Sequence, residues 1–169
     1  TAEMAFRAAM TGHQVFTTLH TNSALGAFPR LLDIGIQPDI MAGNIIGVIA
    51  QRLVRVLCAQ CKEAYAPTLE ERALLGLAGE SVDYIYRAVG CKQCDNKGYR
   101  GRSAIMELLV MDSDMDELVA RRATAKEMRA AAMAKDFRSL AEEGVQRILD
   151  GTTSIVELAR SVDLTGRYR

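Results

Sequence analysis

The stretch GHQVFTTLHTNSALG, residues 12–26, holds an uncharged run rich in β-branched and aromatic residues between the two histidines of the chain, His13 and His20. Such a run, over residues 14–19, predicts a strand buried on both faces of a parallel sheet. His20 then stands at the carboxyl end of the strand, the edge at which open α/β sheets bind ligands, and His13 stands at the opposite edge. Beside the N–H groups of a following helix, His20 is placed to meet a phosphate, although a polar residue that merely ends a strand fits the pattern as well.

The segments on either side of this run both predict helices. Residues 1–12 carry alanine, methionine and phenylalanine at helical spacing and end at Gly12, which suits the left-handed position after a helix. Residues 21–35 begin with three candidate N-cap residues, continue with leucines and stop at Gly35. Helix, strand and helix in this order predict an α/β fold.

The rest of the chain divides into three kinds of pattern. From Pro38 to Leu57 the chain is apolar around most of a helix circumference, which predicts a buried helix in which Gly43 and Gly47 let another backbone approach. Residues 58–102 are irregular, and residues 103–111 predict a strand.

Helix starts are marked by four capping boxes, in which side chain and backbone cap each other. They are Thr68 with Glu71, Thr124 with Glu127, Ser139 with Glu142, and Ser154 with Glu157. The last three predict consecutive short helices. The acidic run at residues 112–117 lacks the spacing of a calcium loop and favours a helix start through the helix dipole.

Charge and hydropathy exclude several classes of protein. Lysine plus arginine and aspartate plus glutamate number 21 each, so no overall field attracts nucleic acid or an acidic membrane. The longest apolar run, residues 45–50, is far shorter than the roughly 20 residues of a membrane span, and no cleavable signal opens the chain. These features predict a cytosolic protein, and a chain that begins at Thr1 inside a helical pattern is expected to be a piece of something longer.

All four cysteines lie in two CxxC pairs, Cys58 with Cys61 and Cys91 with Cys94. Two such knuckles supply four soft ligands to a tetrahedral structural zinc and leave no open position for catalysis. The competing interpretations are a redox dithiol, which needs only one CxxC, and four ordinary free thiols. Gly98 and Gly101 suit tight turns after the second knuckle.

Basic and aromatic residues surround the second CxxC pair. They are Arg87, Lys92, Lys97, Arg100 and Arg102, with Tyr84, Tyr86 and Tyr99. Such a mixture can follow a nucleic-acid backbone and stack bases, so a nucleic-acid-binding module is one hypothesis. Lysines near zinc thiolates also serve simply to offset their negative charge, and the rest of the chain balances this cluster.

The segments at residues 1–36, AQRLVRVLCAQC at residues 50–61 and GCKQCDNKGYRGRSAIMELL at residues 90–109 together resemble the secretion ATPase superfamily of type II secretion and type IV pilus assembly. The resemblance covers nearly the whole chain. It makes GHQVFTTLHTN the His box of that family, with His20 near the γ-phosphate of ATP and His13 in a less defined catalytic role. The four cysteines favour an assembly motor, because the retraction ATPases of the superfamily generally lack them.

The resemblance implies the carboxyl-side part of a RecA-like ATPase domain followed by a small zinc subdomain and a helical end. Residues 1–57 would be the partial ATPase core, residues 58–102 the zinc subdomain, and residues 103–169 a returning core strand with the C-terminal helices. It further implies a hexamer that binds ATP and magnesium between subunits and acts on an inner-membrane platform protein from the cytoplasm. No nucleic-acid partner is expected, because the rest of the chain balances the charge of the basic cluster.

The chain departs from the family in what it omits. It contains no GxxxxGK[ST] phosphate loop, and the Walker A, Asp box and Walker B motifs and the arginines of the amino-terminal domain are expected before Thr1. Phosphoryl transfer needs these groups, so hydrolysis is expected of the parent protein and not of this piece alone. The alternative from another class is a self-standing zinc-dependent module that binds a protein or nucleic acid without enzymatic activity.

Overall fold

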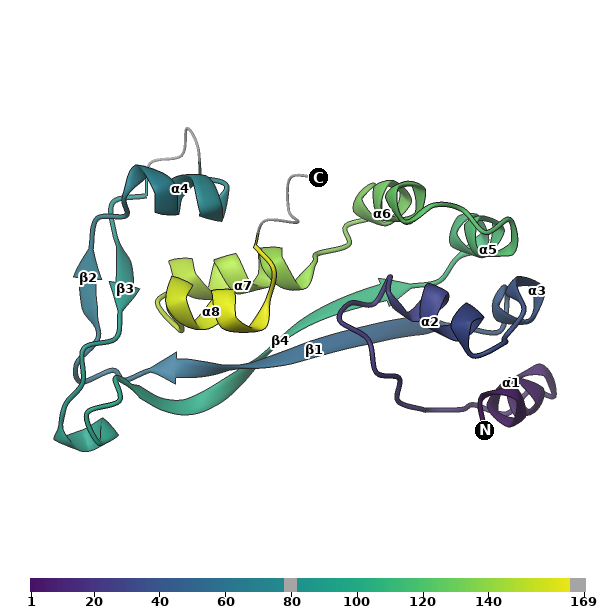
Figure 1. Ribbon diagram of the computed structural model, residues 1–169, viewed down its shortest axis with the longest axis horizontal. Coiled ribbons are helices and arrows are strands. Elements are labelled where there is room, and N and C mark those ends of the chain that lie inside the picture. The colour runs from purple at the N-terminus through teal and green to yellow at the C-terminus, as the bar shows by residue number, and fades with distance from the viewer. Residues whose placement is uncertain (78–81, 165–169) are drawn as a thin grey trace. The chain divides into compact units, whose positions relative to one another are not determined.

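The computed structural model describes residues 1–77 and 82–164, which form two compact units. One unit holds residues 1–50 and 107–138, and the other holds residues 51–106 and those from Ser139 onwards. Two long strands, β1 (Gly47–Leu57) and β4 (Tyr99–Val110), pair as a ribbon (Figure 1). The ribbon is antiparallel, because the N–H of Met111 donates to the carbonyl of Ile46 at one end and the N–H of Cys58 donates to that of Gly98 at the other.

The first unit is built from helices and one end of the ribbon. Its helices are α1 (Ala2–Met10), α2 (Ala27–Asp33), α3 (Pro38–Met41), α5 (Ser113–Ala120) and α6 (Ala125–Met133). Helix α3 packs on α5, where the N–H of Gly43 donates to the carboxylate of Asp116 at 2.8 Å. The buried apolar side chains of this unit include Phe28, Met41, Leu109, Met115 and Met128.

The second unit contains a small hairpin and two packed helices. Its elements are β2 (Glu63–Tyr65), α4 (Leu69–Leu75), β3 (Ile85–Arg87), the 3₁₀ turn η1 (Lys92–Cys94), α7 (Leu140–Leu149) and α8 (Ile155–Ser161). Strands β2 and β3 pair antiparallel with Glu63 opposite Arg87. Helices α7 and α8 approach closely at Gly144, where an added Cβ would lie 2.4 Å from a methyl carbon of Leu158.

Most of the predicted local structure is confirmed. Helix α1 is followed by Gly12 at a φ of 86°, and the strand expected over residues 103–111 is the second half of β4. Three of the capping boxes form in full, at α4, α6 and α7. The acidic run starts α5, with Asp112 as its N-cap. The predicted C-terminal region extends to residue 169, and its last five residues lie outside the described part of the chain.

The helix expected from Pro38 to Leu57 is wrong after its first turn. Gly43 has a φ of 73°, in the left-handed region that ends a helix, and a strand follows. The side chains of Ala50 and Val54 are buried four residues apart. This spacing fits a helix turn and two strand repeats equally well, so the period alone could not separate the two structures.

Gly47 does meet another backbone, although in the ribbon and not in a helix. A Cβ at Gly47 would lie 3.2 Å from the carbonyl oxygen of Leu109. At Gly43 no atom lies within 4 Å of such a Cβ, so only its positive φ favours glycine there.

The parallel strand expected over residues 14–19 does not form. These residues have no regular secondary structure and are exposed, Phe16 to 84%. A strand buried on both faces needs neighbouring strands on its two edges, and β1 to β4 of the described chain pair only with each other. Both described ribbons are antiparallel, so the chain is a mixture of helices and strands without the expected parallel sheet.

Candidate functional site

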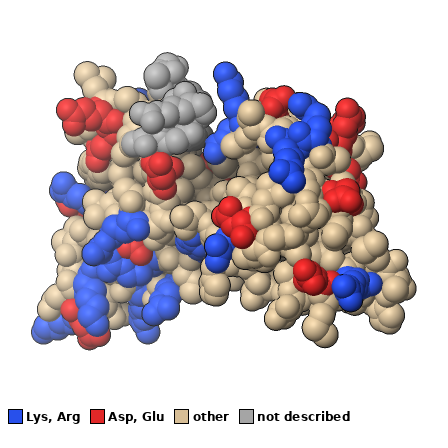
Figure 2. Space-filling view, turned by 45° about the vertical axis from the view of Figure 1, so that its right-hand side comes forward, with Lys and Arg blue, Asp and Glu red and all other residues tan. Residues whose placement is uncertain are grey.

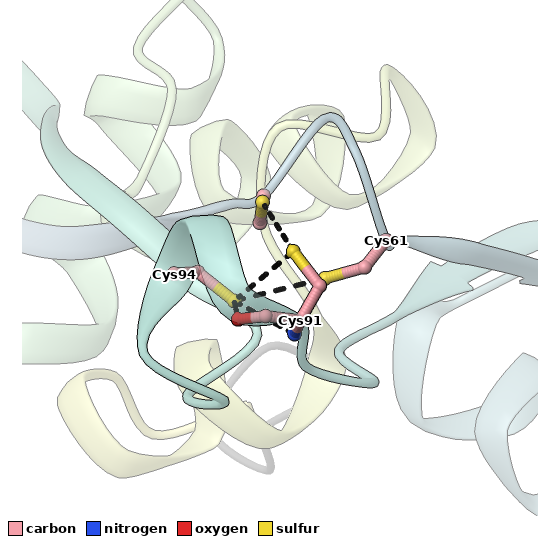
Figure 3. Close-up of side chains that lie close together, drawn as sticks. Cys61, Cys91 and Cys94 are labelled. Carbon is pink, nitrogen blue, oxygen red and sulfur yellow. Dashed lines mark hydrogen bonds between the residues drawn. The ribbon is translucent and has the colours of Figure 1, made fainter.

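The four cysteines converge on one point of the second unit. Their Sγ atoms all lie within 4.8 Å of one another. The separation is 4.0 Å for Cys58 and Cys91, and 3.8 Å both for Cys61 and Cys94 and for Cys91 and Cys94. Figure 3 shows the side chains of Cys61, Cys91 and Cys94 turned toward one another. The two CxxC pairs predicted from the sequence to act together are therefore brought together.

Tight turns hold each pair of cysteines. After β1, the N–H groups of Cys61 and Lys62 both donate to the carbonyl of Cys58, at 3.1 and 2.9 Å. In the second knuckle, the N–H of Asn96 donates to the carbonyl of Cys91 at 2.9 Å. The bond from the N–H of Cys58 to the carbonyl of Gly98, at 2.9 Å, joins the two knuckles.

Glycine is required at two positions in the second knuckle. Gly98 has a φ of 75°, and a Cβ there would lie 2.6 Å from the Cβ of Ala88. Gly90 has a φ of 119°, and a Cβ there would lie 2.7 Å from the carbonyl oxygen of Asn96. Both contacts are with a backbone atom or a Cβ, and neither can rotate away. A side chain at either glycine would therefore require the turn itself to move.

Backbone N–H groups surround the sulfur of Cys94. The N–H of Cys91 and that of Gly98 both donate to its Sγ at 3.2 Å. Burial opposes ionisation of this thiol, yet these donors and the neighbouring thiols lower its pKa to about 6. Burial raises the pKa of Cys61 to about 12, so the metal-free cluster is not fully ionised at neutral pH.

The dimensions of the cluster fit a tetrahedral metal ion. Zinc–sulfur bonds of about 2.3 Å place the sulfurs of a tetrahedron about 3.8 Å apart. Three of the six sulfur pairs are separated by 3.8 to 4.0 Å, and all six lie within 4.8 Å. Four thiolates are soft ligands that select zinc or iron over magnesium and calcium. The cluster can therefore hold a metal ion whose four coordination positions are all filled by cysteine sulfurs.

Two of the five basic residues around the second CxxC pair form ion pairs with carboxylates of the chain itself. Arg87 pairs with Glu63, Lys97 pairs with Asp95, and Lys62 lies 4.4 Å from the ring centre of Tyr86. Arg55 covers the ring of Tyr99 at 4.1 Å, and the Tyr99 hydroxyl bonds to that of Ser154. Figure 2 shows lysine and arginine side chains gathered at the lower left of the drawn face, with carboxylates among them. Two of the three tyrosines of this group, Tyr86 and Tyr99, therefore have a cation over the ring, whereas Tyr84 is 54% exposed.

The two histidines lie on one exposed segment of the first unit. The N–H of His13 donates to the carbonyl of Ala8, which ties the segment to the end of α1, and the His13 Nδ1 lies 3.1 Å from the Thr11 hydroxyl. His20 is exposed at the other end of the segment. Helix α2 begins at Ala27, later than the N-cap residues suggested by the sequence, and a turn fills the interval.

One buried carboxylate in the first unit was not predicted as a site residue. Glu107 on β4 is 3% exposed, and its Oε1 accepts the N–H of Ala24 at 2.5 Å. The only signal in the sequence is its position, because Glu107 stands in phase with Ile105 and Leu109 on the buried side of the strand. A buried acidic side chain needs a hydrogen-bond or charged partner, but the sequence does not show which residue provides it.

The sequence matches one protein family across nearly its whole length. The family model described as "Type II/IV secretion system protein" matches residues 1–160. Among curated relatives, the "Type II secretion system protein E" of Pseudomonas aeruginosa is 44% identical over 95% of this chain and 32% of its own length. The "Type II secretion system ATPase E" of Vibrio cholerae is 43% identical over the same shares.

A third relative belongs to pilus assembly. The "Type IV pilus assembly ATPase PilB" of Thermus thermophilus is 39% identical over 96% of this chain and 19% of its own length. The chain thus spans about a third of the two secretion relatives and a fifth of the pilus relative. The resemblance on which the sequence interpretation rested is confirmed by these matches.

Proposed function

The chain belongs to the family of type II/IV secretion system proteins, and from this we propose that it is part of a motor ATPase that couples ATP hydrolysis to type II secretion or type IV pilus assembly. The observation that carries the proposal is that relatives named as ATPases match 95 and 96% of the chain. The phosphate loop, the lysine and the magnesium-binding carboxylates that hydrolysis requires belong to the remainder of the parent protein. The isolated chain is expected to hydrolyse no ATP.

We assign residues 1–57 to a RecA-like core, residues 58–102 to the metal subdomain and residues 103–169 to the returning strand with the C-terminal helices. The exposed segment at residues 14–19 supports this assignment, because it carries uncharged side chains such as Phe16. In the parent, strands from outside the chain would pair with it. Hydrogen exchange tests the assignment: the amides of residues 14–19 should be protected in the full-length protein and exchange rapidly in the isolated chain.

In this proposal, His20 senses the γ-phosphate of ATP. Its side chain donates a hydrogen bond to a γ-phosphate oxygen and thereby reports whether the nucleotide is ATP or ADP. His13 is a second candidate in the same segment. In the full-length protein, His20→Ala should lower ATP turnover on the order of 10- to 1000-fold with ADP affinity unchanged, because ADP lacks the contacted phosphate. Wild-type turnover in this variant would show that the sensor assignment is wrong.

The four cysteines would hold one structural zinc. The metal would supply bonds that fold the two knuckles together, and Cys94, with two N–H donors on its sulfur, would be held as a thiolate. Metal analysis should give about one zinc per chain, falling with Cys94→Ser. A purified chain that is folded and free of metal would overturn this assignment.

The proposal also includes the setting in which the motor works. A ring of six subunits would bind ATP and magnesium between neighbours and act from the cytoplasm on an inner-membrane platform protein. No helix in residues 1–77 and 82–164 has the length and apolar character of a membrane span. A self-standing zinc module is not favoured, because the matches to named ATPases extend over the histidine segment as well as the cysteines.

A further inference from the structure

Glu107, a residue of the first unit, is a carboxylate placed among apolar residues of β4. It lies on the buried side of β4 between Ile105, which is fully buried, and Leu109, which is 2% exposed. A carboxylate in such surroundings is costly unless hydrogen bonds offset its lost hydration. One of these bonds comes from the N–H of Ala24, 83 residues away in sequence, at 2.5 Å.

Ala24 belongs to the turn that follows His20. Within this turn, the Thr21 hydroxyl donates to the carbonyl of Ser23, and the N–H of Gly26 donates to the hydroxyl of Ser23, each at 3.1 Å. Ala24 itself is fully buried. The turn is therefore ordered within itself, and the bond to Glu107 ties it to β4.

The histidine segment is thus held at both ends. Its start is tied to α1 through the N–H of His13, and its end leads into the turn that Glu107 holds. Only the residues from Thr21 to Ser23 separate His20 from Ala24. A displacement of Ala24 is therefore transmitted to the His20 backbone through three intervening residues.

We propose that Glu107 is a positioning residue that sets the place of His20 by binding the N–H of Ala24. The proposal rests on the proposed role of His20 as the γ-phosphate sensor. A bond from a backbone N–H to a buried carboxylate is about twice as strong as one to a neutral acceptor, which makes Glu107 a firm anchor. Glu107 touches no nucleotide in this scheme and acts only through the turn.

The test is a double-mutant cycle in the full-length ATPase, with ATP turnover and ADP affinity as the measurements. Glu107→Ala and His20→Ala are made singly and together. The matched control is Glu157→Ala, because Glu157 in the second unit is also buried and also accepts a backbone N–H, that of Arg55 at 3.0 Å. Glu107→Gln keeps an acceptor oxygen in the same place.

We expect Glu107→Ala to lower turnover on the order of 10- to 100-fold with ADP affinity unchanged, the size typical of a displaced reacting group. In the His20→Ala background the same change should have no further effect, whereas Glu157→Ala should act equally in both backgrounds. Glu107→Gln should stay within about threefold of the wild type, since it retains the bond to Ala24 in neutral form.

Different outcomes would refute different parts of the proposal. Independent, multiplying effects of Glu107→Ala and His20→Ala on turnover would refute the positioning role and leave the sensor in place. Wild-type turnover in His20→Ala would refute the sensor and the positioning role together. If Glu107→Ala does not fold, Glu107→Gln decides the matter: a loss of turnover as large as that of His20→Ala, with hydrogen exchange at residues 21–26 unchanged, refutes the positioning role.

Discussion

The partly buried ion pair between Arg55 and Glu157 should contribute more to the free energy of unfolding than an exposed ion pair of this protein does. The Glu157 Oε2 accepts bonds from the Arg55 Nε at 2.8 Å and Nη2 at 2.5 Å, and its Oε1 accepts the Arg55 backbone N–H at 3.0 Å. The Glu157 side chain is 8% exposed and that of Arg55 is 38% exposed. An exposed ion pair with similar geometry lies on the hairpin of β2 and β3. Here the Glu63 Oε2 accepts bonds from the Arg87 Nε at 2.9 Å and Nη2 at 2.7 Å, and the side chains of Arg87 and Glu63 are 57 and 55% exposed.

The two ion pairs differ in burial and in the additional bond to a backbone N–H. Replacing the glutamate by alanine should therefore lower the free energy of unfolding by different amounts in the two cases. Glu157→Ala leaves the Arg55 N–H without its partner, which costs about 1–3 kcal/mol. Loss of the charged bonds adds about 1 kcal/mol, a low value because the half-exposed guanidinium regains water. The sum is about 2–4 kcal/mol, whereas Glu63→Ala should cost at most about 1 kcal/mol, as exposed pairs do.

Thermal unfolding of the zinc-loaded chain measures the difference. For a chain of this size each kcal/mol shifts Tm by about 2–4 °C, so Glu157→Ala should lower Tm by about 4–16 °C and Glu63→Ala by at most about 4 °C. The pair with Arg55 lowers the pKa of Glu157, so its contribution is present above the usual carboxyl range and lost as the pH falls through the lowered pKa. Equal Tm losses for the two variants at pH 7 would refute the argument from burial.

Three further predictions concern metal, pH and packing. Removal of metal by a chelator at neutral pH should unfold the region between residues 58 and 98 and be reversed by zinc, which circular dichroism and metal analysis would follow; no structural change would contradict the metal assignment. The N–H and hydroxyl of Thr124, with Arg121, lower the pKa of Glu127 to about 2, so Glu127→Gln should lower Tm at pH 7 and converge with the wild type as the pH falls toward about 2. Gly144→Ala should lower the free energy of unfolding, measured in urea, by about 1 kcal/mol. Crowding against the buried Leu158 costs about 1–3 kcal/mol, which exceeds the roughly 1 kcal/mol gained in helix propensity. A more stable variant would contradict this prediction.

Features decided over a few residues could be predicted from the sequence. A CxxC turn needs only its own backbone to aim two thiols at one point, and the two pairs then required only that the ribbon ends meet. The capping box of Thr124 with Glu127 is likewise closed within one turn. Such features depend little on the rest of the fold, so the pattern and the structure agree.

Features decided by distant partners could not be predicted in the same way. Residues 47–57 became a strand because β4 pairs with them, and nothing in their own period distinguishes that outcome from a helix. Residues 14–19 have strand composition, yet no described strand pairs with them and no ladder forms. Composition shows what a segment can become, while hydrogen-bond partners decide what it is.

The fourth capping box shows how a distant partner overrides a local motif. Ser154 caps α8 as predicted, since its hydroxyl accepts the N–H of Glu157 at 3.3 Å. The return bond that would complete the box is absent from the described contacts of α8, because the Glu157 carboxylate is directed to Arg55, 102 residues earlier in the chain. The bonds to a guanidinium and a strand N–H are together stronger than a single bond to the N-cap amide of Ser154 would be. Glu107 follows the same logic without any local motif. Both carboxylates bind partners that are distant in the sequence, and a local pattern cannot identify such partners.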